Sequence, residues 1–192
     1  MSYQAILNNI KKHIALSEEE TNIFTSLIHL KYFDKKETLL NENSSCKNFY
    51  FVNSGCLKAV HTDKDLNENI IMFAFRDWWI TDMYSFTTGK PSMLSIESIY
   101  EGSVCALNKK DMDKLCIKIP KFERFFRIIM QNAYIREQVR VIENLSMSAE
   151  ERYLKFIQRY PEISLQISKK QIASYLGITP EFLSVIRKKT ST

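Results

Sequence analysis

The spacing of apolar residues divides the chain into three stretches. In residues 3–30, apolar side chains recur every three or four positions, as in a helix that packs one face on a core, and Ser17 and Glu20 form a capping box. In residues 31–107, short apolar or alternating runs lie between turn-prone segments, which predicts antiparallel strands. From residue 108 the helical period returns. The pattern predicts an α+β fold with an antiparallel sandwich or jelly roll between helical ends.

The middle stretch is expected to consist of short strands that are separated by turns. Asn53-Ser54-Gly55 is one such turn, and it lies between two apolar runs. After Trp78-Trp79-Ile80, a polar segment leads to Pro91. The expected strands cover residues 32–33, 38–40, 49–52, 57–60, 70–73, 94–99 and 103–107.

Residues 121–145 are predicted to form one long helix with two apolar faces. A helix that packs on a sheet needs only one such face, which Phe122 and Phe126 begin. The second face has the 4-3-4-3 spacing of a parallel coiled coil, with one Asn that would fix the register. A helix buried on two sides within one subunit would also have two apolar faces. In the coiled-coil interpretation the dimer seam consists of Ile128, Asn132, Ile135, Val139 and Ile142.

The last stretch, residues 168–189, predicts two short helices joined by a tight corner. Ser168 and Gln171 form a capping box, Gly177 suits the left-handed end of the first helix, and Thr179 caps the second. A corner of this length is typical of a DNA-reading helix-turn-helix, although an αα-hairpin shares much of the pattern. Before the pair, Ser148 and Glu151 form a further capping box. It starts a predicted helix over residues 152–160, which Pro161 ends, and an extended link is expected over residues 162–167.

Most of the net positive charge lies in this last part of the chain. The 192 residues have a net charge of +5; from Ser146 onward there are eight Lys or Arg and four Asp or Glu, against 19 and 18 before it. Binding to a polyanion requires such a distribution, although solvated basic surfaces are also common. No apolar run approaches the roughly 20 residues that cross a bilayer, and no signal peptide is recognisable at the N-terminus. We therefore expect a cytoplasmic protein without a membrane partner.

Cysteine and histidine spacing gives no sign of a metal centre. The four cysteines lie far apart without a C-x-x-C pair, and the three histidines form no H-x-H or H-x-x-x-H pair. We expect reduced, mostly buried thiols, and no metal site, cofactor or catalytic residue.

Two segments, Arg152–Phe156 with Tyr160-Pro161 and Ile172–Glu181, resemble the Crp/Fnr family of transcription regulators, as does the order of the parts. Phe49–Leu57 is similar to a hairpin of that family that ends in a turn glycine. The resemblance covers roughly residues 15–189 and implies a homodimer whose recognition helices lie about 34 Å apart on an inverted repeat in double-stranded DNA. It divides the chain into a cyclic-nucleotide-binding-like β-roll sensor with N-terminal helices (1–120), a dimerisation helix (121–145) and a helix-turn-helix domain (146–192).

The resemblance also assigns residues to DNA binding. Glu181 stands where the family's recognition helix has a glutamate, and a carboxylate there can accept a hydrogen bond from cytosine N4. Pro180 and Val185 stand where better-known relatives carry arginines, and Val185 can instead contact a thymine methyl. The family's β-wing after this helix is reduced or missing. Other contacts to bases or phosphates are expected from Ser168, Lys169, Lys170, Thr179, Ser184, Arg187 and Lys188.

The positions that bind a cyclic nucleotide in this family differ here. Such members use a glutamate for the ribose and an arginine for the phosphate. Thr81-Asp82 and Ser92-Met93-Leu94 occupy those positions and lack the arginine, so cAMP and cGMP are not expected to bind. The nearby aromatic residues line a pocket for a more apolar effector or fill a core that needs no ligand. The residues assigned to an effector site are Trp78, Trp79, Asp82, Tyr84, Lys90 and Ser92.

The leading hypothesis is a homodimeric DNA-binding transcription regulator that is not an enzyme. Its expected partners are double-stranded DNA, RNA polymerase and an unidentified small-molecule effector. The alternative is a small-molecule-binding β-roll whose degenerate helix pair no longer reads DNA. The reduced or missing wing and the two missing arginines support this alternative. A cupin-type jelly-roll enzyme is disfavoured because the sequence has no His-rich metal motif.

Overall fold

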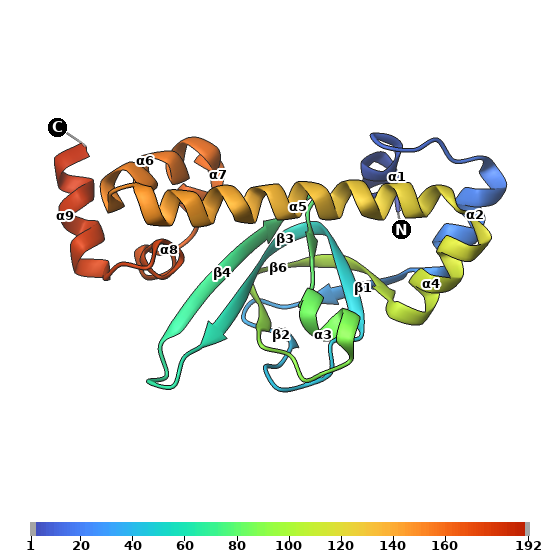
Figure 1. The fold of residues 1–192 in the computed structure, drawn as a ribbon, viewed down its shortest axis with the longest axis horizontal. Coiled ribbons are helices and arrows are strands. Elements are labelled where there is room, and N and C mark those ends of the chain that lie inside the picture. The colour runs from blue at the N-terminus through green and yellow to red at the C-terminus, as the bar shows by residue number, and fades with distance from the viewer. Residues whose placement is uncertain (1–2, 191–192) are drawn as a thin grey trace. The chain divides into compact units, whose positions relative to one another are not determined.

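The computed structural model describes residues 3–190, which combine an antiparallel sheet with helices before and after it (Figure 1). This confirms the predicted α+β class. The helices are α1 (Gln4–Lys11), α2 (Glu18–Leu27), α3 (Met83–Thr88), α4 (Lys109–Lys118), α5 (Lys121–Ser146), α6 (Ala149–Arg159), α7 (Pro161–Gln166), α8 (Lys169–Leu176) and α9 (Pro180–Thr190). The strands are β1 (His29–Phe33), β2 (Thr38–Leu40), β3 (Asn48–Thr62), β4 (Glu68–Phe75), β5 (Trp79–Ile80) and β6 (Ser95–Asn108).

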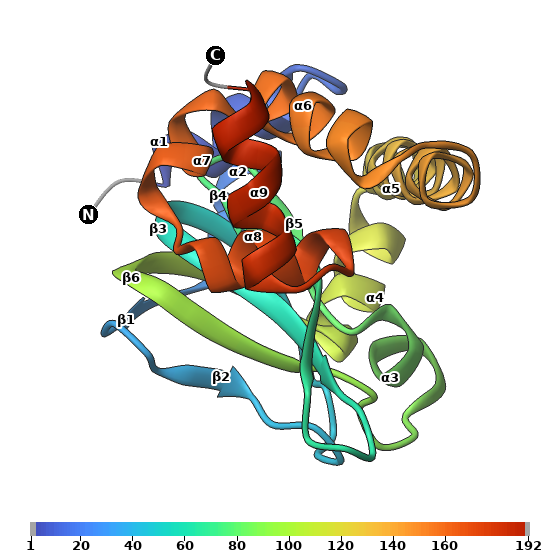
Figure 2. The ribbon, with the colours of Figure 1, turned by 90° about the vertical axis from the view of Figure 1, so that its left-hand side faces the viewer.

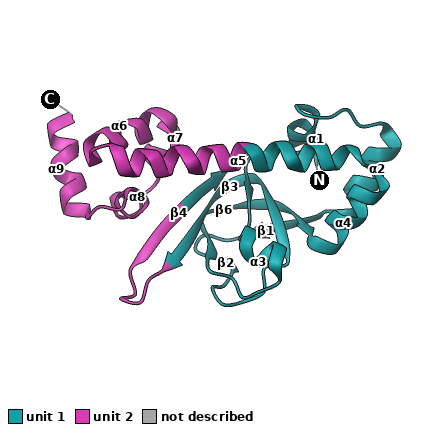
Figure 3. Ribbon diagram, in the orientation of Figure 1, with its two compact units in different colours: residues 1–61, 72–131 teal, residues 62–71, 132–192 magenta. Residues whose placement is uncertain are grey.

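The chain forms two compact units (Figure 3). The β-roll unit comprises residues 1–61 and 72–131, and the C-terminal unit comprises residues 62–71 and 132–192. The C-terminal unit therefore contains the tip of the β3–β4 hairpin, a segment that lies in the middle of the sequence. Within residues 3–190, no helix is both long enough and apolar enough to cross a membrane.

The sheet is built around two long strands instead of the shorter ones predicted. The strand order is β1-β6-β3-β4, and β2 and β5 pair with β6 and β3. The predicted turn at residues 53–55 is wrong, because β3 continues through it with shifts in register against β6. Gly55 has a φ of +82°, and a Cβ there would lie 2.5 Å from the carbonyl oxygen of Glu101. Gly55 therefore makes a β-bulge where two backbones approach closely, and it does not close a hairpin.

Two other segments also differ from the prediction. The polar segment before Pro91 contains α3, whose first turn is capped by the side chain of Asp82. The predicted extended link over residues 162–167 is wrong, because Pro161 begins α7. A proline at the first helical position loses no hydrogen bond and has the required φ, so it starts a helix here as well as ending the previous one.

The core of the β-roll unit joins the sheet to the N-terminal helices and the first turns of α5. Phe24 on α2 stacks on Phe122 of α5, with ring centroids 5.1 Å apart. Phe122 and Phe126 are buried, as the first apolar face of the long helix predicts, and Phe125 joins them. The capping boxes predicted at Ser17, Ser148 and Ser168 are confirmed.

The C-terminal unit packs α6, α7, α8 and α9 around a small apolar core. In the helix pair, α9 packs on α8 (Figure 2), and Ala173 is fully buried where a larger side chain would separate the two helices. Gly177 ends α8 in the left-handed conformation, with a φ of +66°, as predicted. The core consists of Tyr153, Phe156, Tyr160, Ile167, Ile172, Ala173, Leu176, Leu183 and Ile186.

Candidate nucleic-acid interface

Helix α9 has one buried side and one exposed side. Leu183 and Ile186 are buried and fix the helix on the C-terminal unit. Glu181, Val185 and Lys188 are exposed at positions i, i+4 and i+7, which places them along one line on the outer side. Ser184 and Arg187 are half-exposed. The outer side therefore presents an acid, an apolar side chain and a cation in sequence along the helix axis.

The hydroxyl groups at the starts of the two helices serve as caps. Thr179 Oγ1 accepts a hydrogen bond from the backbone N–H of Phe182 at 3.2 Å, and Ser168 Oγ accepts one from Gln171 at 3.2 Å. Ser184 Oγ donates to the carbonyl oxygen of Pro180 at 2.9 Å. Lys169 and Lys170 are exposed on the first turn of α8. The predicted DNA-binding residues thus all lie on α8, on α9 or at their caps, and all are at least half-exposed.

The tip of the β3–β4 hairpin is hydrogen-bonded to α8. Ser174 Oγ donates to the carbonyl oxygen of Glu68 at 2.5 Å and accepts from the backbone N–H of Ile70 at 2.9 Å. Sequence reasoning missed this contact, because Ser174 is separated from Glu68 by 106 residues and no local pattern marks the pair. The first helix of the pair is therefore held by a segment of the sheet strands as well as by α9.

Arg140 of α5 joins the same three segments. Its guanidinium donates to the carbonyl oxygens of Ile71, Ile70 and Tyr175, the last two at 3.3 Å. It also lies 4.4 Å from the centroid of the Tyr175 ring, within cation–π range. Burial raises the pKa of the Tyr175 hydroxyl to about 12, so this hydroxyl is neutral at physiological pH.

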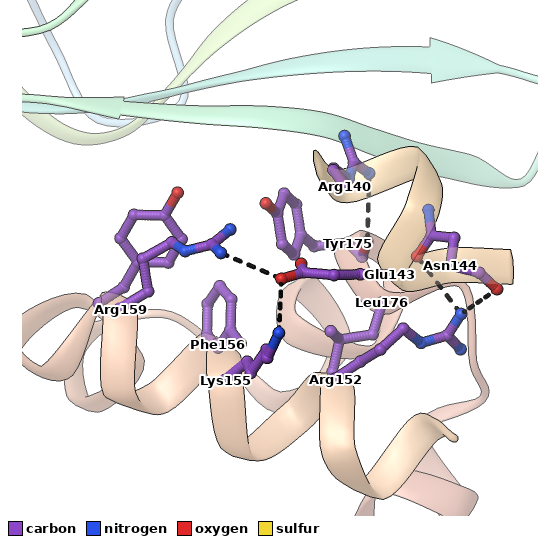
Figure 4. Close-up of a pocket in the computed structure, with 10 residues that line it drawn as sticks. Arg140, Glu143, Asn144, Arg152, Lys155, Phe156, Arg159, Tyr175 and Leu176 are labelled. Atoms are coloured by element: carbon purple, nitrogen blue, oxygen red, sulfur yellow. Dashed lines mark hydrogen bonds and ion pairs between the residues drawn. The ribbon is translucent and has the colours of Figure 1, made fainter. Parts of the chain in front are cut away.

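A second polar cluster joins α5 to α6 around a pocket of about 20 Å³ (Figure 4). The carboxylate of Glu143 accepts from Lys155 at 3.1 Å and from Arg159 at 3.2 Å. Arg152 donates to the backbone and side-chain oxygens of Asn144, both at 3.3 Å. A pocket of this size holds about one water molecule, so the cluster is a structural joint between the two helices.

The predicted dimer seam on α5 lies open. Ile128 is half-buried and Asn132 is exposed. Ile135, Val139 and Ile142 are between 38% and 56% exposed, which is high for aliphatic side chains. This exposure disagrees with the alternative of a helix buried on two sides within one subunit. Tyr134, Val141 and Leu145 are also exposed on α5.

Comparison with known proteins finds similar domains, sequences and folds. Residues 30–118 match the family of cyclic nucleotide-binding domains. The chain is 24% identical over 181 residues to an anaerobic regulatory protein of Pasteurella multocida, covering 88% of this chain and 66% of that protein. It is 23% identical over 183 residues to the fumarate and nitrate reduction regulatory protein of Vibrio cholerae, covering 88% of this chain and 72% of that protein.

A solved structure from Eubacterium rectale, assigned to transcription regulators of the Crp/Fnr family, has the same fold with a TM-score of 0.72. The two chains are 14% identical, and the match covers 92% of this chain and 84% of the other. In sequence and in fold, the chain therefore resembles transcription regulators of the Crp/Fnr family.

Two residues of the predicted effector site are hydrogen-bonded to each other in this chain. Asp82 is only 3% exposed, and its carboxylate accepts from the backbone N–H of Ser85 at 3.1 Å, from Ser92 Oγ at 2.7 Å and from the backbone N–H of Met93 at 2.8 Å. Ser92 is buried as well. The carboxylate therefore already has three hydrogen-bond donors from its own chain.

The remaining predicted effector residues are spread over the β-roll unit. Trp79 packs on Phe49 with ring centroids 4.9 Å apart, and its indole N–H donates to Asn9 Oδ1 at 3.1 Å. Trp78 packs on Phe75 at 5.0 Å. Tyr84 and Lys90 are exposed. The structure thus brings Asp82 and Ser92 together but places the two tryptophans in aromatic packing.

The four cysteines of this chain are all free thiols. Cys46, Cys56 and Cys105 are buried, and Cys116 is half-buried. Burial raises the pKa of the Cys56 thiol to about 12 and that of Cys116 to about 11, which keeps both protonated at physiological pH. Within the described residues, no group of three or more His, Cys, Asp or Glu side chains has an arrangement suited to a metal ion.

Proposed function

We propose that this chain is a transcription regulator of the Crp/Fnr type, which acts as a homodimer and binds an inverted repeat in double-stranded DNA through α9. The observation that carries the proposal is the outer side of α9, where Glu181 and Lys188 stand exposed while Leu183 and Ile186 are buried. A recognition helix needs this division, because it must be fixed from behind while its outer side chains enter the major groove.

Each outer group suits a different part of the duplex. Glu181 lies in the first turn of α9 and is proposed to accept a hydrogen bond from cytosine N4. Ser184 is proposed to contact a base edge or a phosphate. The phosphates would be bound by Lys169, Lys170, Arg187 and Lys188, and by backbone groups near the caps at Ser168 and Thr179.

The dimer is proposed to form along α5. The open stripe of Ile135, Val139 and Ile142 would pair with the same stripe of a second copy, and Asn132 would fix the register. A two-fold axis along this seam presents two copies of α9, and half-sites one helical turn apart, about 34 Å, suit such a dimer. RNA polymerase is a further proposed partner, because a regulator of transcription acts on the enzyme that transcribes the gene.

The effector is proposed to be something other than a cyclic nucleotide. A ribose hydroxyl would have to compete with Ser85, Ser92 and Met93 for the buried carboxylate of Asp82. The cyclic phosphate would also lack a buried arginine partner, and Lys90 nearby is exposed. Titration calorimetry of the full chain with cAMP should give no binding heat, and micromolar binding would contradict this part of the proposal.

The test of DNA binding starts from duplexes that the full chain selects from random DNA. Affinity for a selected site should fall about a thousandfold or more between 50 and 200 mM salt if six or more phosphates are contacted. Replacing Lys188 by Gln should weaken binding to all sequences and reduce the salt slope by about one. A failure to select DNA, or an affinity independent of salt, would favour a β-roll that binds small molecules only.

Glu181→Ala tests base readout separately. It should relax the preference at one base pair in each half-site, at a cost of about 1–3 kcal/mol for the preferred base, and leave the salt slope unchanged. Glu101→Ala, which removes an exposed carboxylate from β6, is the matched control and should leave the selected sequence unchanged. A uniform loss of affinity across sequences in Glu181→Ala would exclude this residue from base readout.

A further inference from the structure

Two apolar side chains stand exposed on α9, Val185 on its outer side and Phe182 on the flank beside it. Phe182 is 50% exposed and Val185 is 61% exposed. They are three residues apart on the helix, so their side chains are neighbours. We refer to Phe182 and Val185 as the apolar pair. Neither side chain belongs to the buried core that fixes α9, which uses Leu183 and Ile186.

The apolar pair lies in the middle of an otherwise charged surface. Val185 stands between Glu181 and Lys188 on the exposed line of α9, and Arg187 and Lys189 lie in the last turn. Lys189 is paired with Glu150 at 2.7 Å. An apolar spot with cations on its C-terminal side suits a ligand that carries negative charges beside apolar groups. Duplex DNA is such a ligand, because phosphates border a major groove that contains thymine methyl groups.

Neither member of the pair can read a base through hydrogen bonds. A valine or phenylalanine side chain has no donor for guanine O6 or N7 and no acceptor for cytosine or adenine amino groups. The apolar group that base pairs present in the major groove is the C5-methyl of thymine. A base pair without that methyl would leave the side chain facing polar edges.

We propose that Phe182 and Val185 recognise thymine methyl groups, so that each half-site contains thymines beside the base pair read by Glu181. The proposal rests on the DNA-binding function argued above and adds the chemistry of the site. A helix rises about 1.5 Å per residue and stacked bases about 3.4 Å, so Val185 lies about 6 Å, or two base steps, along α9 from Glu181. The thymines are expected within about two base pairs of the base that Glu181 reads.

The experiment replaces thymine by uracil, which removes the methyl group and keeps every hydrogen-bonding group. A site selected by the full chain is synthesised with uracil at one thymine position at a time, and the affinities are measured at a fixed salt concentration. At one or two positions per half-site, uracil should weaken binding about fourfold, the effect of exposing one buried methyl group. At the remaining positions it should have no effect.

Variants connect the loss to the apolar pair. In Val185→Ala, the ratio of the affinities for the thymine site and the uracil site should fall to about one at one position. Phe182→Ala should have the same effect at another position, and the salt slope should stay unchanged in both variants. Both side chains are exposed, so the fold should tolerate the changes, and circular dichroism checks this. Leu165→Ala is the matched control, since it removes an apolar side chain that is exposed on α7, and it should leave every ratio unchanged.

The outcomes separate this proposal from the function on which it rests. Binding with the same affinity to thymine and uracil sites at every position would overturn the role of the apolar pair and leave DNA binding intact. If both alanine variants still bind the thymine sites more tightly than the uracil sites, the proposal is also overturned. If the full chain selects no DNA at all, the proposed function fails and this inference fails with it.

Discussion

Asp82 organises the segment between β5 and β6 through a single carboxylate. It caps α3 by accepting from Ser85, and it accepts from Ser92 and Met93 across the loop that follows. The sequence places Asp82 and Ser92 in one candidate site, and the structure does bring them together. The pattern could not reveal that they bond to each other, because the bond joins residues ten positions apart across a helix and a turn.

Replacing Asp82 by Ala should destabilise the β-roll unit. Three donors would lose their acceptor in a buried site, so the free energy of unfolding should fall by about 3 kcal/mol, measured by urea denaturation of the full chain. Ser17→Ala removes an exposed N-cap on α2 and should cost only about 1 kcal/mol. Equal losses in the two variants would mean that Asp82 acts as an ordinary helix cap.

At the scale of helices and strands, local signals were reliable and long-range ones were not. The capping boxes at Ser17 and Ser168 form from residues three apart, so the sequence alone placed both helix starts. Gly55 was predicted to end a strand, but its conformation depends on Gly102, which lies opposite it on β6. A glycine in a turn and a glycine in a bulge have the same local signature, and only the partner strand distinguishes them.

The open stripe on α5 allows a direct test of the proposed dimer. Val139→Glu would place a carboxylate at the middle of the seam, where burial against a second copy is costly, so the dimer dissociation constant should rise about a hundredfold. Sedimentation of the full chain measures this change. Val141→Glu makes the same substitution on an exposed residue about 160° away around the helix and should leave the dimer intact.

The opposite result would show that the subunits pair through a different face of α5. If Val139→Glu sediments as a dimer and Val141→Glu as a monomer, the interface involves Tyr134, Val141 and Leu145 instead. If both variants remain dimeric, α5 does not carry the main contact between subunits.

At the scale of the whole molecule, the two units are not consecutive in the sequence. Residues 62–71 leave the β-roll unit, join the C-terminal helices and return to the sheet. The apolar pattern did predict a run at residues 70–73, but it gave no indication that the hairpin tip belongs with α8. The contact depends on backbone carbonyls and on Ser174 and Arg140, which are polar groups without a sequence period.

Ser174→Ala should release the hairpin tip. The Ile70 amide would lose its acceptor and the Glu68 carbonyl its donor, each worth about 1 kcal/mol, so hydrogen exchange at the Ile70 amide should accelerate about five- to tenfold. Ser184→Ala removes a hydroxyl that bonds only within α9, to the carbonyl of Pro180, and should leave this exchange rate unchanged. An unchanged rate in Ser174→Ala would show that other contacts hold the tip.

This interleaving has a practical consequence for protein engineering. Cutting the chain before residue 132 and transplanting the excised helices onto another β-roll would leave behind the strand segment that Ser174 and Arg140 bind. The grafted piece would expose two polar side chains and several backbone groups that are satisfied in the parent. A working chimera therefore has to carry the hairpin tip along with the helices, so the natural place to exchange parts is not a single point in the sequence.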